Sequence, residues 1–330
     1  SLVFEFVVAV FVRHPVTPLV PDFDAAEYER VPMAFYWSRA LLFDGGPIEG
    51  IVGNRNLLGM VALIGVIVFG ALLAAKAIRR ASGITWLVIA GATLLLTRSA
   101  TVILVAVVVA IAFAFAVWVR RRGPERRRPV YLTGLLAFVA SVAALVALWT
   151  PLTALFGKSE DVTGRFEIWG AVSGLAAERP IAGWGWLGYW QPWAEPLGSL
   201  YTRNGVTYLQ AHNAWLDVWL QLGVLGLVAF GAVVVGALWR SWFLAIDRPK
   251  DPAGRPRPYT SASFVPFLLM IALAGQSLAE SRLLVEGGLL LLITIAWATK
   301  QRQWEPEPLP VEPARTRYDR RPESGAATRR

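Results

Sequence analysis

His212, Arg165 and Arg98 are the residues of this chain whose types could do chemistry together. The chain has two histidines, His14 and His212, and a neutral imidazole can serve as a general base near pH 7. His212 lies in QAHNAWLDVW, where a polar stretch turns into a tryptophan-rich apolar run, Arg165 lies in TGRFEIW, and Arg98 lies in LLTRSATVIL. A guanidinium binds phosphate through paired, charged hydrogen bonds. Together they could hold a pyrophosphate beside a base, provided that the fold brings them together.

Each of these residues also has a plainer interpretation. His212 alone fits a hydrogen-bonded histidine at the end of a helix, and Arg165 alone fits a solvated charge in a loop. An arginine inside an apolar hairpin, such as Arg98, is costly and therefore indicates a functional role. The segment after His212 has a polar residue at every fourth position: Asn213, Asp217 and Gln221. Such a stripe lies on one helix face and faces a protein interior or a watery cavity, so we expect His212 to open a polar cleft.

The composition predicts an all-α, polytopic membrane protein. Hydrophobic residues make up 55% of the chain, and the mean hydropathy is +0.50. The apolar runs are continuous rather than alternating, which favours membrane helices over a transmembrane barrel. There is no cysteine, so disulfide and zinc–thiolate chemistry are excluded. The net charge of +9 comes from basic residues in short connections between apolar runs, which is typical of membrane topology rather than of nucleic-acid binding.

We expect about eight membrane spans. The stretch 84–119 would reach about 54 Å as one helix, too long for one crossing, so we divide it at Arg98. The expected spans cover residues 1–12 (the end of one span), 55–75, 84–97, 99–119, 130–150, 212–239, 262–279 and 283–299. The chain begins at Ser1 inside an apolar segment, and we expect a fragment that lacks N-terminal spans.

The charges of the connections alternate from span to span. On one side lie the basic connections 76–80, 120–128 and 240–258 and the tail. On the other side lie the acidic 14–53 connection, Arg98, the long 151–211 loop and the Glu280/Arg282 hairpin tip. The positive-inside rule places the basic side in the cytoplasm. We therefore expect a membrane domain over residues 1–299 with its polar candidates on the extracytoplasmic face, and a disordered cytoplasmic tail over residues 300–330. The basic connections could also contact anionic lipid.

Two other patterns are weak. Residues 183–188 read GWGWLG, a literal G-x-G-x-x-G, but a dinucleotide site needs this pattern between a strand and a helix. We expect Gly183 and Gly185 to form tight turns that place Trp184, Trp186 and Trp190 at the membrane surface. Asp22-Phe23-Asp24 could bind a divalent cation, but without a third ligand a solvated loop explains it better.

The motifs around Arg165 and His212 resemble the O-antigen ligase/polymerase family. The matching stretches are TGRFEIWGAVSGLAAERPIAGWGWLGYW and AHNAWLDVWLQLGVLGLVAF. The matching positions are Gly164, Arg165, Trp169, Pro180, Gly183, Gly185, His212, Asn213, Leu216, Gly223 and Gly226. Upstream, GIVGNRNLLGMVALI resembles the family's Gly/Asn segment, with Asn56 at the usual Asn. In all, the resemblance covers most of residues 45–295.

The sequence departs from the family's pattern at one arginine. The family often has SRG or SRA at the outer end of a hairpin, whereas this chain has TRSA, with Arg98 before the serine. One residue corresponds to about 100° of rotation on a helix. The family also has around a dozen spans, and about eight are visible here.

The resemblance implies a metal-independent, inverting membrane glycosyltransferase that needs no cofactor. The donor would be a glycan on undecaprenyl pyrophosphate, at the outer face of the cytoplasmic membrane, and the acceptor a hydroxyl of a glycan, lipid or other envelope component. Arg165, with Arg98, would hold the pyrophosphate, and His212 would deprotonate the acceptor. Asn213 and Asp217 would orient His212, and Trp169 and Asn56 would belong to the substrate site. Polymerase and ligase both fit the sequence.

Two other classes compete with the transferase. A lipid-linked glycan transporter or flippase would have internal repeats and polar residues at several span centres, and the sequence has neither. A structural membrane anchor would leave the Arg/His set unexplained.

Overall fold

The computed structural model describes residues 1–17, 31, 35–147, 160–203, 206–247, 255 and 258–304, and it is almost entirely helical. The α-helices are α1 (Leu2–Val7), α2 (Arg55–Ala74), α3 (Arg80–Leu96), α4 (Ala100–Arg122), α5 (Arg127–Ala147), α7 (Glu160–Glu178), α8 (Ala214–Ile246), α9 (Val265–Ser277) and α10 (Glu286–Trp304). The other helical elements of these described residues are one π-helical turn (Val8–Val12) and four short 3-10 turns (Gly50–Val52, Pro124–Arg126, Ser261–Phe264 and Ser281–Leu284). Strands β1 (Thr202–Arg203) and β2 (Val206–Thr207) form an antiparallel hairpin, with Thr202 opposite Thr207.

Short polar side chains start three of the long helices. Asn54 accepts hydrogen bonds from the second and third backbone amides of α2, Asn213 does the same for α8, and Ser99 caps α4. These caps satisfy amides that have no partner within the helix. Helix α3 ends at Leu96, and Arg98 has a left-handed backbone with φ 47°. The break expected at Arg98 is therefore present, and it separates α3 from α4.

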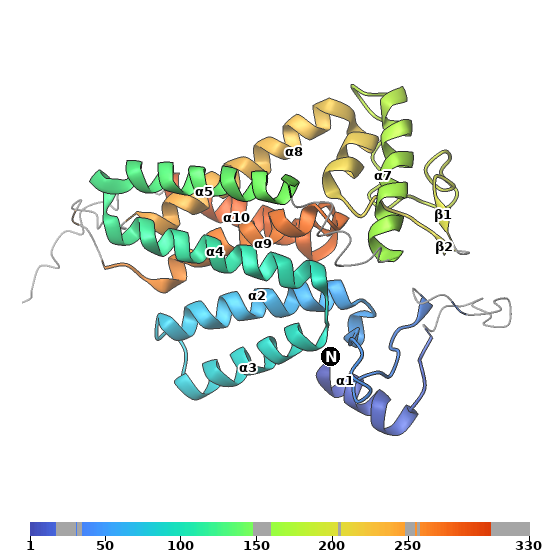
Figure 1. The fold of residues 1–330 in the computed structure, drawn as a ribbon, viewed down its shortest axis with the longest axis horizontal. Helices are drawn as coiled ribbons and strands as arrows, with labels where there is room; N and C mark the ends of the chain where they lie inside the picture. The colour runs from blue at the N-terminus through green and yellow to red at the C-terminus, as the bar shows by residue number, and fades with distance from the viewer. Residues whose placement is uncertain are drawn as a thin grey trace, which may run out of the picture.

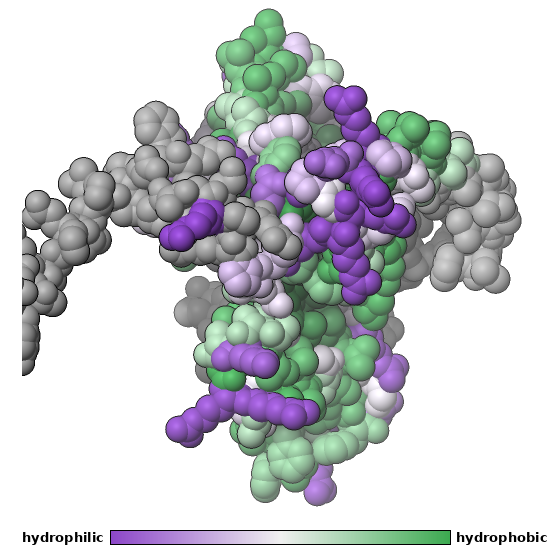
Figure 2. Space-filling model, turned by 90° about the vertical axis from the view of Figure 1, so that its left-hand side faces the viewer, coloured by the Kyte–Doolittle hydropathy of each residue, from purple (hydrophilic) through white to green (hydrophobic). Residues whose placement is uncertain are grey.

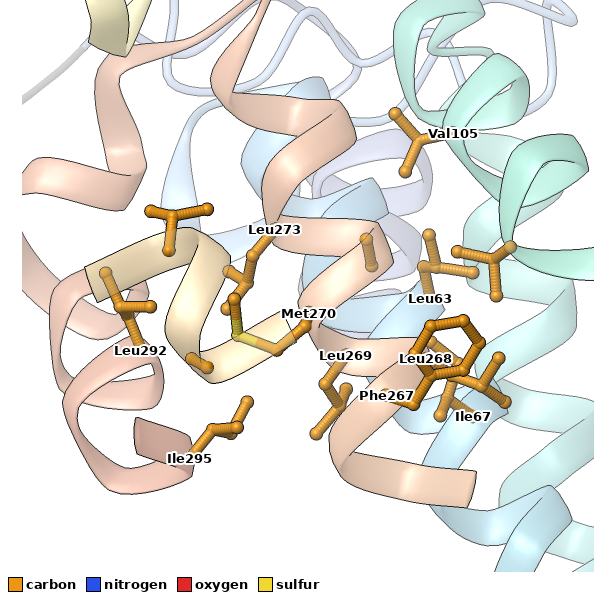
Figure 3. Packing of buried hydrophobic residues seen from close by; sticks show 14 of the residues in the cluster. Leu63, Ile67, Val105, Phe267, Leu268, Leu269, Met270, Leu273, Leu292 and Ile295 are labelled. Atoms are coloured by element: carbon orange, nitrogen blue, oxygen red, sulfur yellow. The ribbon is translucent and has the colours of Figure 1, made fainter. Parts of the chain in front are cut away.

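The helices α2 to α5 and α8 to α10 pack together as an elongated bundle (Figure 1). Helix α9 lies at its centre, and its side chains pack among those of α2, α4 and α10 (Figure 3). The labelled core residues are Leu63 and Ile67 of α2, Val105 of α4, Phe267, Leu268, Leu269, Met270 and Leu273 of α9, and Leu292 and Ile295 of α10. The outward faces of the same helices are apolar as well; Leu104, Leu135 and Val228 are examples. A bundle that is apolar inside and outside fits a lipid environment.

The basic connections gather at one end of the bundle, the arginine-rich end. There Arg120 bonds to the carbonyl of Ala245 at 2.5 Å and lies over the ring of Phe264 at 3.7 Å, which ties α4 to the end of α8 and the start of α9. Arg127 bonds to Asp247 at 2.6 Å. Hydrophilic residues gather at this end (Figure 2). Helix α8 runs on to Ile246, so Arg240, expected in a basic connection, is instead helical and bonds to Thr299 of α10 at 3.3 Å.

The opposite end, the site end, is covered by a second layer that the sequence did not predict. Helix α7 lies within the region expected to be a loop over 151–211, and it packs against α8. Helix α7 and the start of α8 lie across the direction of the bundle, and the β1–β2 hairpin lies beside α7 on the outer side (Figure 1). This layer has its own buried cluster, made of Ile168, Val172, Ala176, Trp190, Leu197, Ala211 and Leu220.

Helix α8 is broken at Gly223, whose φ of 62° and ψ of −162° are open to glycine alone. The segment 180–185 fills the break with backbone hydrogen bonds in both directions. The amides of Trp184 and Gly185 donate to the carbonyls of Leu220 and Gln221 at 3.0 and 2.9 Å, and the amides of Val224 and Leu225 donate to the carbonyls of Pro180 and Ile181 at 2.9 and 3.3 Å. In an unbroken helix these two carbonyls and two amides would bond to each other, and here each has a backbone partner in the segment 180–185 instead.

This insertion explains the GWGWLG motif. Gly183 has φ 71°, and a Cβ there would lie 2.4 Å from the backbone of Gln221. The glycines therefore let two backbones touch. The expectation for the tryptophans was wrong for Trp190, which is fully buried, while Trp186 is 45% exposed.

Within the part of the chain that the structure describes, three helices are long and apolar enough to cross a membrane: α2, α4 and α8. Shorter apolar helices cover Leu2–Val12, Arg80–Leu96 and Ser261–Ser277. The helix positions follow the expected spans closely, although α10 extends to Trp304 and takes in the first residues of the expected tail. Asp22, Asp24 and residues 305–330 lie outside the described residues.

Candidate functional site

A single buried carboxylate, that of Glu280, gathers the residues of the site. Its Oε1 accepts a hydrogen bond from Asn56 Nδ2 at 2.8 Å and one from Arg165 at 3.3 Å. Its Oε2 lies 3.1 Å from Nδ1 of His212. The Glu280 side chain is only 4% exposed, whereas Arg165 and His212 are each 24% exposed. A guanidinium and an imidazole therefore meet on one carboxylate and still reach the surface.

Four separate elements supply these side chains. Asn56 is in the first turn of α2, Arg165 in the second turn of α7, and His212 just before the cap of α8. Glu280 lies between α9 and the 3-10 turn Ser281–Leu284. Asn56 also accepts a hydrogen bond from Ser99 at 2.7 Å, which connects the start of α4 to the same network. The site therefore forms only where the bundle and the second layer meet.

Opposing effects act on the charge of Glu280. Burial acts to raise the pKa of this carboxyl, but the hydrogen bond and charge of His212, the charge of Arg165 and the hydrogen bond of Asn56 outweigh burial, so the pKa lies below its usual value. Glu280 is therefore an anion at neutral pH.

The contact with Glu280 determines the proton arrangement on His212. A carboxylate can only accept hydrogen bonds, so Nδ1 of His212 carries the proton in this contact. In the neutral ring Nε2 is then the basic nitrogen. The imidazole and the Tyr208 ring form a T-shaped contact, with ring centroids 5.9 Å apart and an angle of 72° between the planes. His212 has a left-handed backbone with φ 49°, a conformation uncommon for residues other than glycine.

Asp217 accepts hydrogen bonds from the residues next to both His212 and Glu280. It is 1% exposed and accepts hydrogen bonds from the backbone amide of Ala211 at 3.0 Å, from Trp190 Nε1 at 2.9 Å and from the hydroxyl of Ser281. Ala211 precedes His212, and Ser281 follows Glu280. Asp217 therefore contacts the backbone next to His212, whereas Glu280 is the carboxylate that contacts the His212 imidazole.

The rest of the polar stripe on α8 holds the second layer in place. Gln221 is fully buried; its Oε1 accepts hydrogen bonds from the amides of Leu187 and Gly188 at 2.6 and 3.1 Å, and its Nε2 donates to the carbonyl of Gly188 at 3.0 Å. The stripe faces the protein interior, one of the two environments expected. Asp217 and Gln221 are buried, whereas Asn213, like His212 before it, is only partly buried.

Asn213 and Trp169 contact the backbone. Asn213 caps α8, and its Nδ2 donates to the carbonyl of Leu278 at 3.3 Å. Trp169 donates from Nε1 to the carbonyl of Ala211 at 3.0 Å. Both therefore fix the segment that carries His212.

Arg98 lies beside this network. Its neighbour Ser99 bonds to Asn56, while the Arg98 side chain is exposed and extends toward Gly45. Because the motif is shifted by one residue, Ser99 contacts the network, whereas the Arg98 side chain is exposed to solvent.

Glu280 is the site residue that the sequence did not reveal. It stands with Arg282 in a short polar stretch between two apolar runs, a pattern typical of a solvated hairpin tip. Its one distinguishing signal is that Ala279 and Ser281 beside it are small, which suits a tightly packed turn.

Among the residues that the structure describes, no group of three or more His, Asp or Glu side chains could hold a metal ion. The charges at the site are those of Arg165, Glu280 and, when protonated, His212.

The Glu280 contacts predict a pH dependence of stability. Because the folded pKa is lowered, the carboxylate contributes stability that is complete above the pKa of an unfolded glutamate, about 4.3. This stability is lost as the pH falls through the lowered folded pKa. We expect wild-type protein to unfold at a higher temperature than Glu280→Gln at pH 7, and the difference to shrink below about pH 4. Thermal unfolding of both proteins in detergent from pH 7 to pH 3 measures this; a difference that is constant with pH would contradict it.

Comparison with known proteins gives two matches. A family model described as O-Antigen ligase matches residues 85–231. Those residues include Arg98, Arg165 and His212. The exopolysaccharide production protein ExoQ of Rhizobium meliloti (strain 1021) is 25% identical over 211 residues, which are 62% of this chain and 48% of that relative. The chain thus spans about half the length of the relative that it matches.

Proposed function

We propose that this chain, whose resemblance to the O-antigen ligase/polymerase family both matches support, transfers a glycan from a lipid pyrophosphate carrier to an acceptor hydroxyl. The observation that carries the proposal is the meeting of Arg165 and His212 on Glu280. A base and an anion-binding group side by side are what a single displacement at a sugar phosphate requires.

In the proposed reaction the acceptor oxygen attacks the anomeric carbon, and the bond from that carbon to the pyrophosphate oxygen breaks. The acceptor proton moves to Nε2 of His212, since Nδ1 is held by Glu280. Glu280 stabilises the imidazolium that forms, as a carboxylate does for a catalytic histidine. The leaving pyrophosphate keeps the electron pair, and the charge on it is stabilised by Arg165. A single displacement inverts the configuration and needs neither metal nor cofactor.

The donor is proposed to be a glycan on undecaprenyl pyrophosphate in the cytoplasmic membrane. The site end would then face the extracytoplasmic side, and the arginine-rich end and the tail the cytoplasm, as the positive-inside rule requires. We propose that α3, α5, α9 and α10 lie in the membrane beside α2, α4 and α8, which with the segment 1–12 gives the expected eight spans. Arg98, exposed next to the network, is available to a second phosphate oxygen.

Substitution of the two proposed catalytic residues tests this function. We expect His212→Ala and Arg165→Ala, in the full-length protein in its host, to abolish the surface glycan while undecaprenyl-linked precursor accumulates outside the cytoplasmic membrane. General-base loss alone lowers turnover by about 10²–10⁴-fold. Glycan staining and extraction of the lipid-linked pool measure both quantities, and immunoblotting controls for protein level.

The accumulated precursor distinguishes the possible roles. Single repeat units would indicate a polymerase, and long lipid-linked chains a ligase. Precursor retained on the cytoplasmic side would indicate a flippase, and unchanged glycan in both variants would refute the catalytic assignment.

A further inference from the structure

A row of tyrosines leads from His212 onto the β1–β2 hairpin. The Tyr208 ring lies 5.9 Å from the His212 ring, and the Tyr201 ring lies 5.6 Å from that of Tyr208. We propose that this row, with Glu167 and Arg203 at its far end, binds the sugar units next to the reacting one. We call these four residues the tyrosine strip. The proposal deepens the proposed function and rests on it.

The far end of the strip is polar and electrically balanced. The Tyr201 hydroxyl donates to Glu167 Oε2 at 2.5 Å, and a guanidinium nitrogen of Arg203 lies 3.8 Å from the same oxygen. The Glu167 side chain is 52% exposed, so its carboxylate can accept further hydrogen bonds from a ligand. Because the carboxylate and the guanidinium offset each other, this surface offers no excess charge to a phosphate.

These features match the chemistry of a sugar chain. A pyranose ring has apolar C–H faces and a rim of hydroxyls. The faces gain by covering aromatic rings, which bury a large apolar area. The hydroxyls gain by charge-assisted hydrogen bonds to a carboxylate or guanidinium. Binding sites for small ligands combine these elements: an aromatic surface and a few polar groups that fix orientation.

The position of the strip fits a chain that leaves the membrane. The hairpin lies on the outer side of α7, away from the helix bundle (Figure 1). At the other end of the row, His212 meets Glu280 and the bundle. A glycan with its reacting sugar at His212 would therefore extend along Tyr208 and Tyr201 toward the solvent.

The tyrosines also pack against the buried cluster of the second layer, so binding must be separated from folding. The test uses the full-length protein in lipid nanodiscs and the variants Tyr208→Ala, Tyr208→Phe and Glu167→Gln. Trp193→Ala is the matched control, since Trp193 is 80% exposed in the same layer but outside the strip. The probe is the oligosaccharide released from the host's own surface polysaccharide by mild acid, with binding followed by saturation-transfer NMR.

We expect Tyr208→Ala to weaken binding of this oligosaccharide about tenfold, the value of a good aromatic contact. Tyr208→Phe should bind as wild type, because the ring is kept, and Glu167→Gln should weaken binding about threefold through loss of a charged hydrogen bond. In the transfer assay we expect Tyr208→Ala and Glu167→Gln to raise KM and to leave kcat nearly constant. A higher KM for the acceptor would place the acceptor glycan on the strip, and a higher KM for the donor would place the donor glycan there.

The outcomes separate this proposal from the proposed function. If His212→Ala abolishes transfer while folded Tyr208→Ala and Glu167→Gln bind the oligosaccharide as wild type, the strip proposal is overturned and the transferase stands. If the strip variants lose binding but His212→Ala still transfers, the subsite stands and the catalytic assignment fails. If Tyr208→Ala does not fold, Glu167→Gln compared with Trp193→Ala decides: wild-type binding by Glu167→Gln overturns the strip.

Discussion

Glu280→Gln should lower transfer about a hundredfold or more, the range expected when a general base is lost, although the substitution preserves size and shape. Oε1 of Glu280 accepts hydrogen bonds from two donors, Asn56 and Arg165, whereas the partner of Oε2 among the described residues is His212. The oxygen of a glutamine would therefore stay with the two donors, and its NH2 group would point at the imidazole.

That orientation reverses the proton arrangement on His212. An NH2 group donates, so Nδ1 would have to accept, and the ring proton would move to Nε2. The nitrogen proposed to face the acceptor hydroxyl would then carry a proton already and could not take another. The substitution also removes the negative charge that stabilises the imidazolium. Both effects act on turnover rather than on substrate affinity.

A steady-state assay with purified full-length protein measures kcat and KM for this variant. The control is Glu286→Gln at the start of α10, since Glu286 is 51% exposed and has no described contact with His212. We expect the control to retain kcat. A folded Glu280→Gln protein with wild-type kcat would show that His212 does not depend on this carboxylate, and the proposed base would have to be reassigned.

Gly183→Ala and Gly223→Ala should each destabilise the protein by several kcal/mol, because overpacking costs about 1–3 kcal/mol and a left-handed backbone adds about 1–2 kcal/mol. A Cβ on Gly223 would lie 2.2 Å from the carbonyl oxygen of Ile181, and one on Gly183 would lie 2.4 Å from the backbone of Gln221. Both contacts are with backbone, which cannot rotate away. The segment 180–185 would be pushed out of the break in α8.

Gly170→Ala is the matched control, since Gly170 is in helix α7 and a Cβ there meets nothing within 4 Å. It should stabilise α7 by up to about 1 kcal/mol. Thermal unfolding in detergent and protein level in the membrane measure all three variants. Wild-type stability of Gly223→Ala would mean that the break in α8 is not required for the fold.

Much of the bundle could be predicted because apolar runs and polar breaks are local signals. The run over 55–75 became α2, and the break at Arg98 separates α3 from α4. Helix α7 was missed because its segment has no long apolar run. The helix buries only one face, which carries Ile168, Val172 and Ala176. The break in α8 was missed because it depends on a segment about forty residues earlier in the chain.

At the site, too, local signals could be predicted from the sequence and contacts between distant segments could not. The resemblance pointed to Arg165, His212 and Asn56, and these three side chains do share one partner. That partner, Glu280, could not be found in the sequence, because its burial arises only when α2, α7 and the start of α8 come together around it. Asp217 was expected to orient His212, and the structure places its contact on the backbone amide of Ala211, the residue before His212. The sequence could not specify this contact, since the direction of the Asp217 side chain depends on its packing with Trp190 and Ser281.

The break in α8 also bears on how far this helix reaches through a bilayer. Its 33 residues would measure about 50 Å if straight, whereas the hydrocarbon layer is about 30 Å thick. The part from residue 224 to residue 246 measures about 34 Å and is long enough to cross by itself. The remaining residues turn sideways with α7 (Figure 1), so in the proposed orientation they would lie along the membrane surface. A lipid-anchored substrate diffuses in that plane and would meet His212 without leaving its leaflet.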